Sequence, residues 1–319
     1  MGFGRVMLGK TANGLYWMCR YLERAETTAR LVHTAYRISL TRSNNLQEQW
    51  VSVMKTAGMD DLFRAHNGNS VVDNSINWML RSSRNPSSVL SSVSQARSNA
   101  RLVRTALTAI VWAAINRAFI DIKQKLSRRV SERNLPEVLE LISDRIRSIN
   151  GAIEGTMLRN EIFNFMRLGT FIERADSTAR IIDVRYYVLL PSLNAVGSSL
   201  DNVQWDIILR SISAKGGFRM EYGSSAGARE ITEFLVLKKT MPRSLNFCVS
   251  KLRQNLHYLQ TEQAKHTPAF QKAIQIEENY MGFTTEALFK FGLHEYIQKI
   301  IASLIDLSSQ IEADFRFHN

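Results

Sequence analysis

A stretch of twelve residues occurs twice in this chain, and this repeat constrains the fold more than any other feature of the sequence. Residues 21–32 read YLERAETTARLV, and residues 171–182 read FIERADSTARII. Each position is identical or is replaced by a close chemical neighbour, as Tyr by Phe or Glu by Asp. We therefore expect a tandem duplication, with a first repeat over residues 1–150 and a second over residues 151–319, packed as one globular unit.

The composition predicts an all-α protein. Of the 319 residues, 45% are hydrophobic and 22% are charged, which is typical of a globular protein, and only five are proline. Long stretches rich in Ala, Leu, Arg, Glu, Lys and Ile carry helical spacing, whereas no clean strand pattern of period two appears. We expect a helical bundle in which the two repeat-bearing helices, near residues 12–41 and 161–190, pack against each other about a pseudo-twofold axis.

The first of these helices carries apolar bulk nearly all round. One side holds an apolar stripe, and the opposite side holds Trp17, Tyr21 and Leu31. Such a helix is expected at the centre of the fold. Further helices are expected near residues 50–58 and 73–84, from residue 87 past residue 126, over a short segment after Pro136, and after residues 268 and 282, with connections at 191–202 and 214–230.

Each copy of the repeat holds an adjacent Glu-Arg pair, Glu23-Arg24 and Glu173-Arg174. Neighbouring residues on a helix point in different directions, so neither pair bridges to itself. A buried ion without a partner is strongly destabilising. One interpretation is structural, with each carboxylate meeting an arginine from the other repeat.

The alternative interpretation of the same charges is a ligand site. Two glutamates and up to four arginines would converge on a cleft between the repeats and bind a small anionic or zwitterionic ligand. Arg30 and Arg180, which follow the pairs on the same helices, suit bidentate contacts with a carboxylate. A third interpretation places the motif at a partner surface.

Other chemistry finds little support in the sequence. Two cysteines, Cys19 and Cys248, are too few for a disulfide framework, and a reducing cytoplasm fits best. No Glu-x-x-His pair, phosphate loop or Gly-rich turn after a strand is present, so we predict no metal, no cofactor and no nucleotide chemistry. Whether the protein is an enzyme stays open.

Charge and hydropathy bear on the partners. The apolar run at residues 106–115 falls short of the roughly 20 residues that a membrane span requires, so we expect a buried core helix and no membrane. The net charge of +12 points to an anionic partner. The basic residues are spread out and no nucleic-acid-binding motif accompanies them, which does not favour nucleic acid.

Three stretches carry a family resemblance: MLGKTANGLYWMCRYLERAETTARL, NPSSVLSSVSQARSNARLVR, and GTMLRNEIFNFMRLGTFIERADSTARIIDVRYYVLLPS, with QWDIILRSISA and MPRSL further on. Together they resemble the alpha-E family, helical bacterial proteins named for a repeated ER motif. The resemblance assigns this motif to Glu23-Arg24 and Glu173-Arg174. The family's ARENAR run falls at residues 96–101, where Ser98 replaces the expected Glu and Asn99 and Arg101 remain.

The resemblance implies a functional context and no reaction. Such proteins resemble members of gene neighbourhoods that hold ATP-grasp ligases, transglutaminase-like proteins and proteasome-like hydrolases, a peptide or amide synthesis and modification system. We therefore expect a component that works with an ATP-grasp ligase and binds a small substrate between the repeats. The alternatives are a non-catalytic adaptor that docks the ligase or the transglutaminase-like protein, and a nucleic-acid binder. The candidate cluster is Glu23, Arg24, Arg30, Asn99, Arg101, Glu173, Arg174 and Arg180.

Overall fold

The described residues form an all-α fold, as the composition predicts. The computed structural model describes residues 7–40, 50–51, 53–55, 57–67, 72–184, 205–206, 208–223, 227–262 and 266–318, and the regular elements within these ranges are all helical. In chain order they are α1 (Gly9–Ser39), α3 (Asp60–Asn67), α4 (Val72–Arg81), α5 (Val89–Leu102), the 3₁₀ turn η1 (Arg104–Ala106), α6 (Ala109–Lys125), α7 (Leu135–Thr156), α8 (Glu161–Val184), α10 (Lys215–Tyr222), α11 (Ala228–Thr232), the π-helical turn η4 (Glu233–Leu237), α12 (Leu245–Glu262), α13 (Pro268–Tyr280), α14 (Thr285–Phe291) and α15 (Leu293–Asp314).

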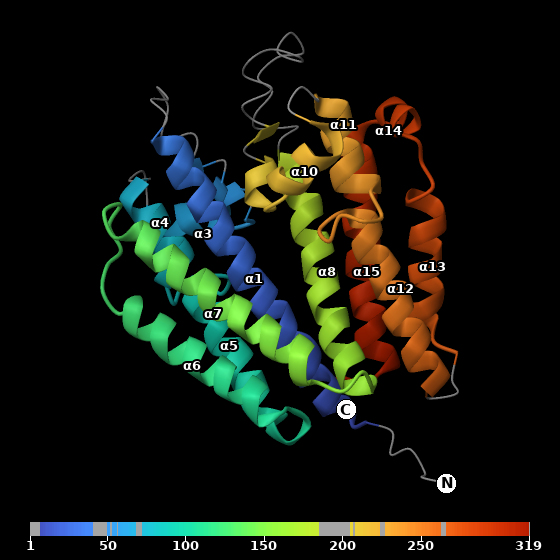
Figure 1. The fold of residues 1–319 in the computed structure, drawn as a ribbon, viewed down its shortest axis with the longest axis horizontal. Helices are drawn as coiled ribbons and strands as arrows, with labels where there is room; N and C mark the ends of the chain where they lie inside the picture. The colour runs from blue at the N-terminus through green and yellow to red at the C-terminus, as the bar shows by residue number, and fades with distance from the viewer. Residues whose placement is uncertain are drawn as a thin grey trace.

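The two repeat-bearing helices, α1 and α8, pack against each other at the centre of the molecule (Figure 1). Helices α5 and α7 cover α1 on one side, with α6 outside them, and α12 and α15 cover α8 on the other, with α13 outside them. This double coverage explains why α1 is apolar nearly all round: Leu15, Met18 and Leu22 are buried, and so is Leu31 on the opposite side.

The two halves share a local pattern at the helices that cover α1 and α8. Helix α5 packs against α1, and α12 packs against α8. Each begins after a Pro-x-Ser sequence whose serine is an N-cap. Ser88 Oγ accepts the N–H of Ser91 at 3.2 Å, and Ser244 Oγ accepts the N–H of Phe247 at 3.0 Å. The pattern agrees with a duplicated chain, although the duplication itself and the repeat boundaries at 150 and 151 stay predictions.

The prediction of one long helix from residue 87 past residue 126 is wrong. Helix α5 ends at Leu102, and the next α-helix, α6, begins at Ala109. Thr108 caps α6 by accepting the N–H of Val111 at 3.3 Å, and its hydroxyl also pairs with that of Thr156 at 2.8 Å. This cap lies within the apolar run that suggested one continuous helix. Only one face of α6 is buried, since Ile110 is exposed.

Two other expected elements also differ. The helix after Pro136 is not short: α7 has 22 residues, because isoleucines and leucines at helical spacing give it a continuous buried face. The segment at 214–230, expected to be a connection, contains α10. That helix is fixed by Phe218, which is buried and stacks against Tyr222 with ring centroids 5.1 Å apart. The expected connection at 191–202 lies outside the described residues.

Gly169 allows α8 to approach α1 closely. A Cβ atom at this position would lie 2.1 Å from the backbone oxygen of Tyr16, a backbone atom that cannot move independently of its helix. The corresponding position of the first repeat is Cys19, so only one of the two helices carries the small residue. The central helix contact therefore depends on the absence of a side chain at residue 169.

We predict that Gly169→Ala lowers the free energy of unfolding by about 1–3 kcal/mol or more, because the added methyl group forces α8 away from α1. Chemical denaturation monitored by circular dichroism measures this change. Gly151→Ala is the matched control: this glycine lies exposed in α7 with nothing within 4 Å of the added Cβ. The control should gain about 0.5–1 kcal/mol from the better helix propensity of alanine. Equal stability of the two variants would contradict the close-approach argument.

Candidate functional site

The Glu-Arg pairs of α1 and α8 form reciprocal ion pairs across the helix interface. Arg24 of α1 binds Glu173 of α8 through two hydrogen bonds, Nε to Oε1 at 2.6 Å and Nη2 to Oε2 at 3.0 Å. Arg174 of α8 binds Glu23 of α1 in the same way, at 3.1 and 2.8 Å. Both glutamates are buried, each with 3% of its surface exposed. Bidentate geometry makes these the strong form of ion pair.

Each buried glutamate also binds a second arginine, and these come from different places. Arg243, in the turn before α12, donates from Nη1 to Glu23 Oε1 at 2.6 Å. Arg20, on α1 itself, donates from Nε to Glu173 Oε2 at 2.9 Å and from Nη1 to Ser308 of α15 at 3.0 Å. Every oxygen of both carboxylates therefore has a charged donor, as a buried ion requires.

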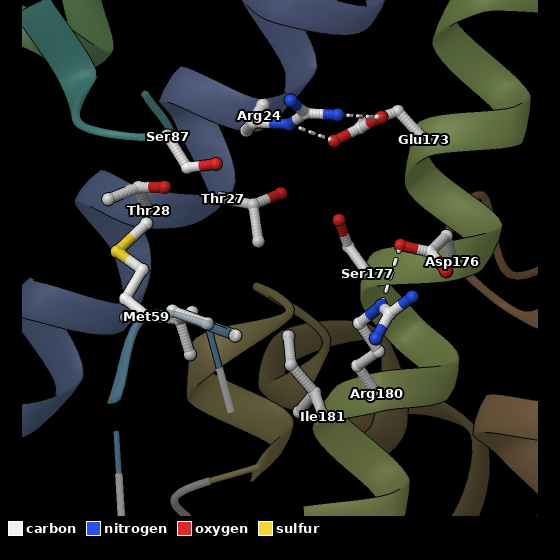
Figure 2. Close-up of a pocket in the computed structure, with 13 residues that line it drawn as sticks. Arg24, Thr27, Thr28, Met59, Ser87, Glu173, Asp176, Ser177, Arg180 and Ile181 are labelled. Carbon is white, nitrogen blue, oxygen red and sulfur yellow. Dashed lines mark hydrogen bonds and ion pairs between the residues drawn. The ribbon is translucent and has the colours of Figure 1, made fainter. Parts of the chain in front are cut away.

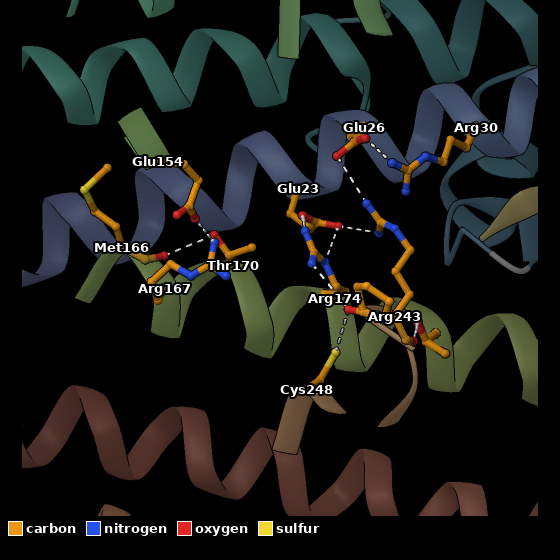
Figure 3. A network of polar contacts seen from close by, with 12 residues as sticks. Glu23, Glu26, Arg30, Glu154, Met166, Arg167, Thr170, Arg174, Arg243 and Cys248 are labelled. Carbon is orange, nitrogen blue, oxygen red and sulfur yellow. Dashed lines mark hydrogen bonds and ion pairs between the residues drawn. The ribbon is translucent and has the colours of Figure 1, made fainter. Parts of the chain in front are cut away.

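An outer carboxylate follows each pair by one helical turn. On α1, Glu26 binds Arg30 within its own helix and also accepts Nη2 of Arg243 at 3.4 Å (Figure 3). On α8, Asp176 binds Arg180 at 2.8 Å, again within its own helix. The arginines at 30 and 180 thus pair along their helices, while Arg20, Arg24 and Arg174 make the ion pairs between α1 and α8.

The electrostatics keep both central glutamates ionised. Burial alone would raise the pKa of the Glu23 carboxyl, but the guanidinium groups of Arg174 and Arg243 outweigh burial and hold that pKa well below its usual value. Burial would also raise the pKa of the Glu173 carboxyl, but Arg24 and Arg20 outweigh burial and lower that pKa. Neither group is therefore poised to exchange a proton near neutral pH.

A cavity of about 280 Å³ opens on the Glu173 side of this network. We name it the Ser87 cavity; its lining includes Ser87, Arg24, Glu173, Asp176 and Arg180. Figure 2 shows Ser87 on one side of the space and the side chains of Asp176 and Arg180 on the other, with the Arg24–Glu173 pair at its edge. Its volume is close to the lower end of the range for small-molecule sites, about 300 Å³.

A second cavity, of about 460 Å³, also has Arg24 in its lining. We name it the Arg81 cavity, after the second arginine in its lining; Tyr21 also lines it, and the lining includes no acidic residue. The partners described for Arg81 are backbone oxygens, since it donates to Leu126 at 2.9 Å and to Ser127 at 3.0 Å. Arg24 is common to both cavities.

The candidate residues of the ARENAR-like run lie elsewhere. Asn99 is half-buried in α5, and its backbone oxygen accepts the N–H of Val103 at 3.2 Å. Arg101 is exposed in the last turn of the same helix. Neither takes part in the ion pairs and hydrogen bonds described above for the cluster. The other six candidates, Glu23, Arg24, Arg30, Glu173, Arg174 and Arg180, take part in its ion pairs.

Sequence reasoning missed Arg20 and Arg243. A signal for Arg243 exists, because the Pro-Arg-Ser sequence at 242–244 matches Pro-Ser-Ser at 86–88 in the first half. Comparing these turns would have singled out residue 243 as a charged position next to a helix start. Arg20 carries no such signal, since the repeat has Thr170 at the corresponding position.

The two cysteines are not placed to act as nucleophiles. Cys19 and Cys248 are buried free thiols, and burial raises the pKa of each to about 12, so neither forms the thiolate that a nucleophile needs. Within the described ranges, no three His, Cys, Asp or Glu side chains are grouped to hold a metal ion. No helix in those ranges has the length and apolar character to cross a membrane.

We predict that Glu23→Gln destabilises the protein by about 3–5 kcal/mol, because the swap keeps the shape but leaves the buried guanidinium of Arg174 without its counter-charge and Arg243 with only its longer contact to Glu26. Thermal or chemical unfolding measures the loss. Glu154→Gln is the matched control: Glu154 binds Arg159 and Arg167 at an exposed site, and its removal should cost about 0–1 kcal/mol. A Glu23→Gln protein as stable as this control would show that the buried pair is not structural.

We also predict an acid-sensitive stability. A carboxyl whose pKa is lower in the folded than in the unfolded protein adds stability above its unfolded pKa and loses it as the pH falls toward the folded pKa. For Glu23 the ordinary value is 4.5 and the folded value lies well below it, so the loss begins as the pH drops through 4.5. Unfolding free energies measured between pH 7 and strong acid should fall more steeply for the natural protein than for Glu23→Gln; parallel curves would contradict the pairing.

Comparison with known proteins identifies one family. Residues 7–315 match Alpha-E, described as a predicted alpha-helical domain with a conserved ER motif. No curated protein and no solved structure matches the chain. The match covers nearly the whole chain, and the two Glu-Arg pairs at the centre of the fold carry the sequence for which the family is named. The protein belongs to the Alpha-E family.

Proposed function

We propose that this protein binds a small amino-acid-like ligand beside the Arg24–Glu173 pair, as a component of a bacterial peptide or amide synthesis or modification system that works with an ATP-grasp ligase. One observation carries the ligand site. Each central glutamate binds two arginines, but Arg24 and Glu173 also line the Ser87 cavity, whereas Glu23 and Arg174 are not part of its lining. Motif residues that serve only to hold the helices together would not need to border open space on one side.

The chemistry of the two cavities supports a ligand that carries both charges. The Ser87 cavity presents the carboxylates of Glu173 and Asp176, which suit an amine or guanidinium group. The Arg81 cavity presents Arg24 and Arg81 without an acidic residue, which suits a carboxylate or phosphate. Arg24 binds Glu173 through Nε and Nη2, so its Nη1 lies outside that pair.

The partnership with a ligase rests on the resemblance to the alpha-E family. An ATP-grasp ligase activates a carboxylate and joins it to an amine, so its substrates and products carry the groups that these cavities suit. The transglutaminase-like protein is a second candidate partner for the same reason. The sequence of the chain contains no phosphate loop, which supports a role without nucleotide turnover of its own. We place this role in the cytoplasm, where its two thiols stay reduced.

A non-catalytic adaptor is the second candidate function, and the Glu23 side of the network favours it. Glu23, Arg174 and Arg243 are each mostly buried and satisfy one another, as expected for a structural interaction. In that role the protein would dock the ligase through its surface and need no ligand. A nucleic-acid binder has only the net charge in its favour.

We predict that the purified protein hydrolyses no ATP alone and changes the amount or identity of the amide product when an ATP-grasp ligase from a neighbouring gene is added. Mass spectrometry of the products measures this effect. Ser177→Phe places a bulky side chain in the lining of the Ser87 cavity and should abolish the effect. Ser148→Phe, at an exposed position of α7, is the control and should retain it.

The outcomes separate the candidate functions. An effect that persists in Ser177→Phe would support the adaptor, because docking through a surface does not need the cavity. Identical products with and without the protein, or ATPase activity of the isolated chain, would contradict the proposed partnership.

A further inference from the structure

The turn before α5 and the turn before α12 occupy corresponding places but differ in one residue. Both have Pro-x-Ser sequences and capping serines, and both precede the helix that covers one of the two central helices. The middle residue is Arg243 in the second turn and Ser87 in the first. Arg243 reaches across to Glu23 and Glu26 of the other half, while Ser87 lines the cavity beside Glu173 and Asp176.

The side chain of Ser87 is short, and a cavity lies beside it. In the other half, the long side chain of Arg243 occupies the corresponding place. The outer carboxylates, Glu26 and Asp176, differ accordingly in the number of arginines they bind. Glu26 binds two arginines, Arg30 and Arg243, whereas the ion pair of Asp176 is with Arg180 through Oδ2. Asp176 Oδ1 is buried and accepts no hydrogen bond from the described residues. The oxygen that binds Arg180 can accept a second hydrogen bond, because each oxygen of an ionised carboxylate has more than one lone pair.

The charge balance restricts what can occupy this space. On the Glu173 side, three arginines already stand against two carboxylates: Arg20, Arg24 and Arg180 against Glu173 and Asp176. A lone cation would add a second net positive charge to a partly buried cluster, which is unfavourable. A ligand with one cationic and one anionic group adds no net charge, and the Arg81 cavity, which shares Arg24 with the Ser87 cavity, offers an acid-free lining for the anion.

We propose that the Ser87 cavity binds the guanidinium group of an arginine-like zwitterion, in the position that Arg243 occupies in the other half. The guanidinium donates to Asp176 and the hydroxyl of Ser87 borders it, while the carboxylate of the same ligand lies toward Arg24 and Arg81. A planar guanidinium suits this place because the corresponding space already accommodates one. This proposal names the ligand class of the site proposed above and rests on it.

Isothermal titration calorimetry on the purified full chain tests the ligand class with three probes. Nα-acetyl-L-arginine carries the guanidinium and the carboxylate without a free amine and is therefore net neutral. N-acetylagmatine lacks the carboxylate, and Nα-acetyl-L-citrulline replaces the guanidinium by a neutral urea group of similar shape. We expect Nα-acetyl-L-arginine to bind at least about tenfold more tightly than either analogue, since each lost charge contact removes 1.4 kcal/mol or more. Equal affinity for Nα-acetyl-L-arginine and Nα-acetyl-L-citrulline, or no binding of Nα-acetyl-L-arginine at millimolar concentration, would overturn the proposal.

Two variants and one control locate the site. Ser87→Arg introduces in the first half the residue that fills the corresponding place in the second, and it should abolish Nα-acetyl-L-arginine binding by filling the cavity from within. Ser98→Arg adds the same charge at an exposed position of α5 outside the cavity and should bind within about twofold of the natural protein. Asp176→Asn, which removes only an outer, partly exposed ion pair, should weaken binding at least about tenfold.

These measurements use the protein alone, so their failure is separate from failure of the proposed function. Binding that survives Ser87→Arg or Asp176→Asn places the ligand elsewhere and overturns the inference. Loss of the ligase effect in Ser177→Phe, without any preference for Nα-acetyl-L-arginine, would leave the proposed function standing and reject only the ligand class. The reverse result would support the ligand and reject the partnership.

Discussion

The reciprocal ion pairs between α1 and α8 are the interaction on which the rest of this structure depends. A Glu-Arg neighbour pair cannot close on itself along a helix, so each buried charge needs a partner from another helix. The second copy of the same sequence supplies it, with Arg24 on Glu173 and Arg174 on Glu23. The pairing requires the two helices to lie in contact, and Gly169 permits that contact. Helices α5 and α12 then cover the pair from outside and keep its carboxylates away from water.

The sequence predicts the centre of this fold better than its edges. The repeated sequence predicts two central helices. Neighbouring residues on a helix cannot pair with each other, so the glutamate of each helix is expected to face an arginine of the other, and both expectations need only local spacing. The break before α6 and the helix α10 were not predictable in this way: the first depends on the cap at Thr108, hidden in an apolar run, and the second on tertiary burial of Phe218. The site residue Arg243 was missed because its role depends on a contact over more than two hundred residues of sequence.

The two halves of the network are alike in charge and different in the space around them. Each central glutamate binds two arginines, so both are equally satisfied as buried ions. The glutamate at 23 takes its second arginine from the turn before α12, which also fills the adjoining space. The glutamate at 173 takes its own from Arg20 of α1, which stacks over the Trp17 ring at 4.4 Å and is not part of the cavity lining. On the Glu23 side one residue, Arg243, both neutralises the carboxylate and fills the adjoining space. On the Glu173 side Arg20 neutralises the carboxylate, and the adjoining space remains a cavity.

This separation explains how one motif can serve both stability and binding. If Glu173 depended on an arginine at residue 87, removing that side chain to open a cavity would leave a buried carboxylate underpaired, which is strongly destabilising. Because Arg20 binds Glu173 from a position outside the cavity lining, residue 87 can be a serine, and the space beside Asp176 is open without loss of the central pair. In the other half, Thr170 stands at the position that corresponds to Arg20, and Arg243 at the position that corresponds to Ser87. Each half therefore has an arginine at one of these two positions, and the position differs between the halves. Arg20 thus supplies on the Glu173 side the second arginine that Arg243 supplies on the Glu23 side, and it does so without occupying the cavity at Ser87.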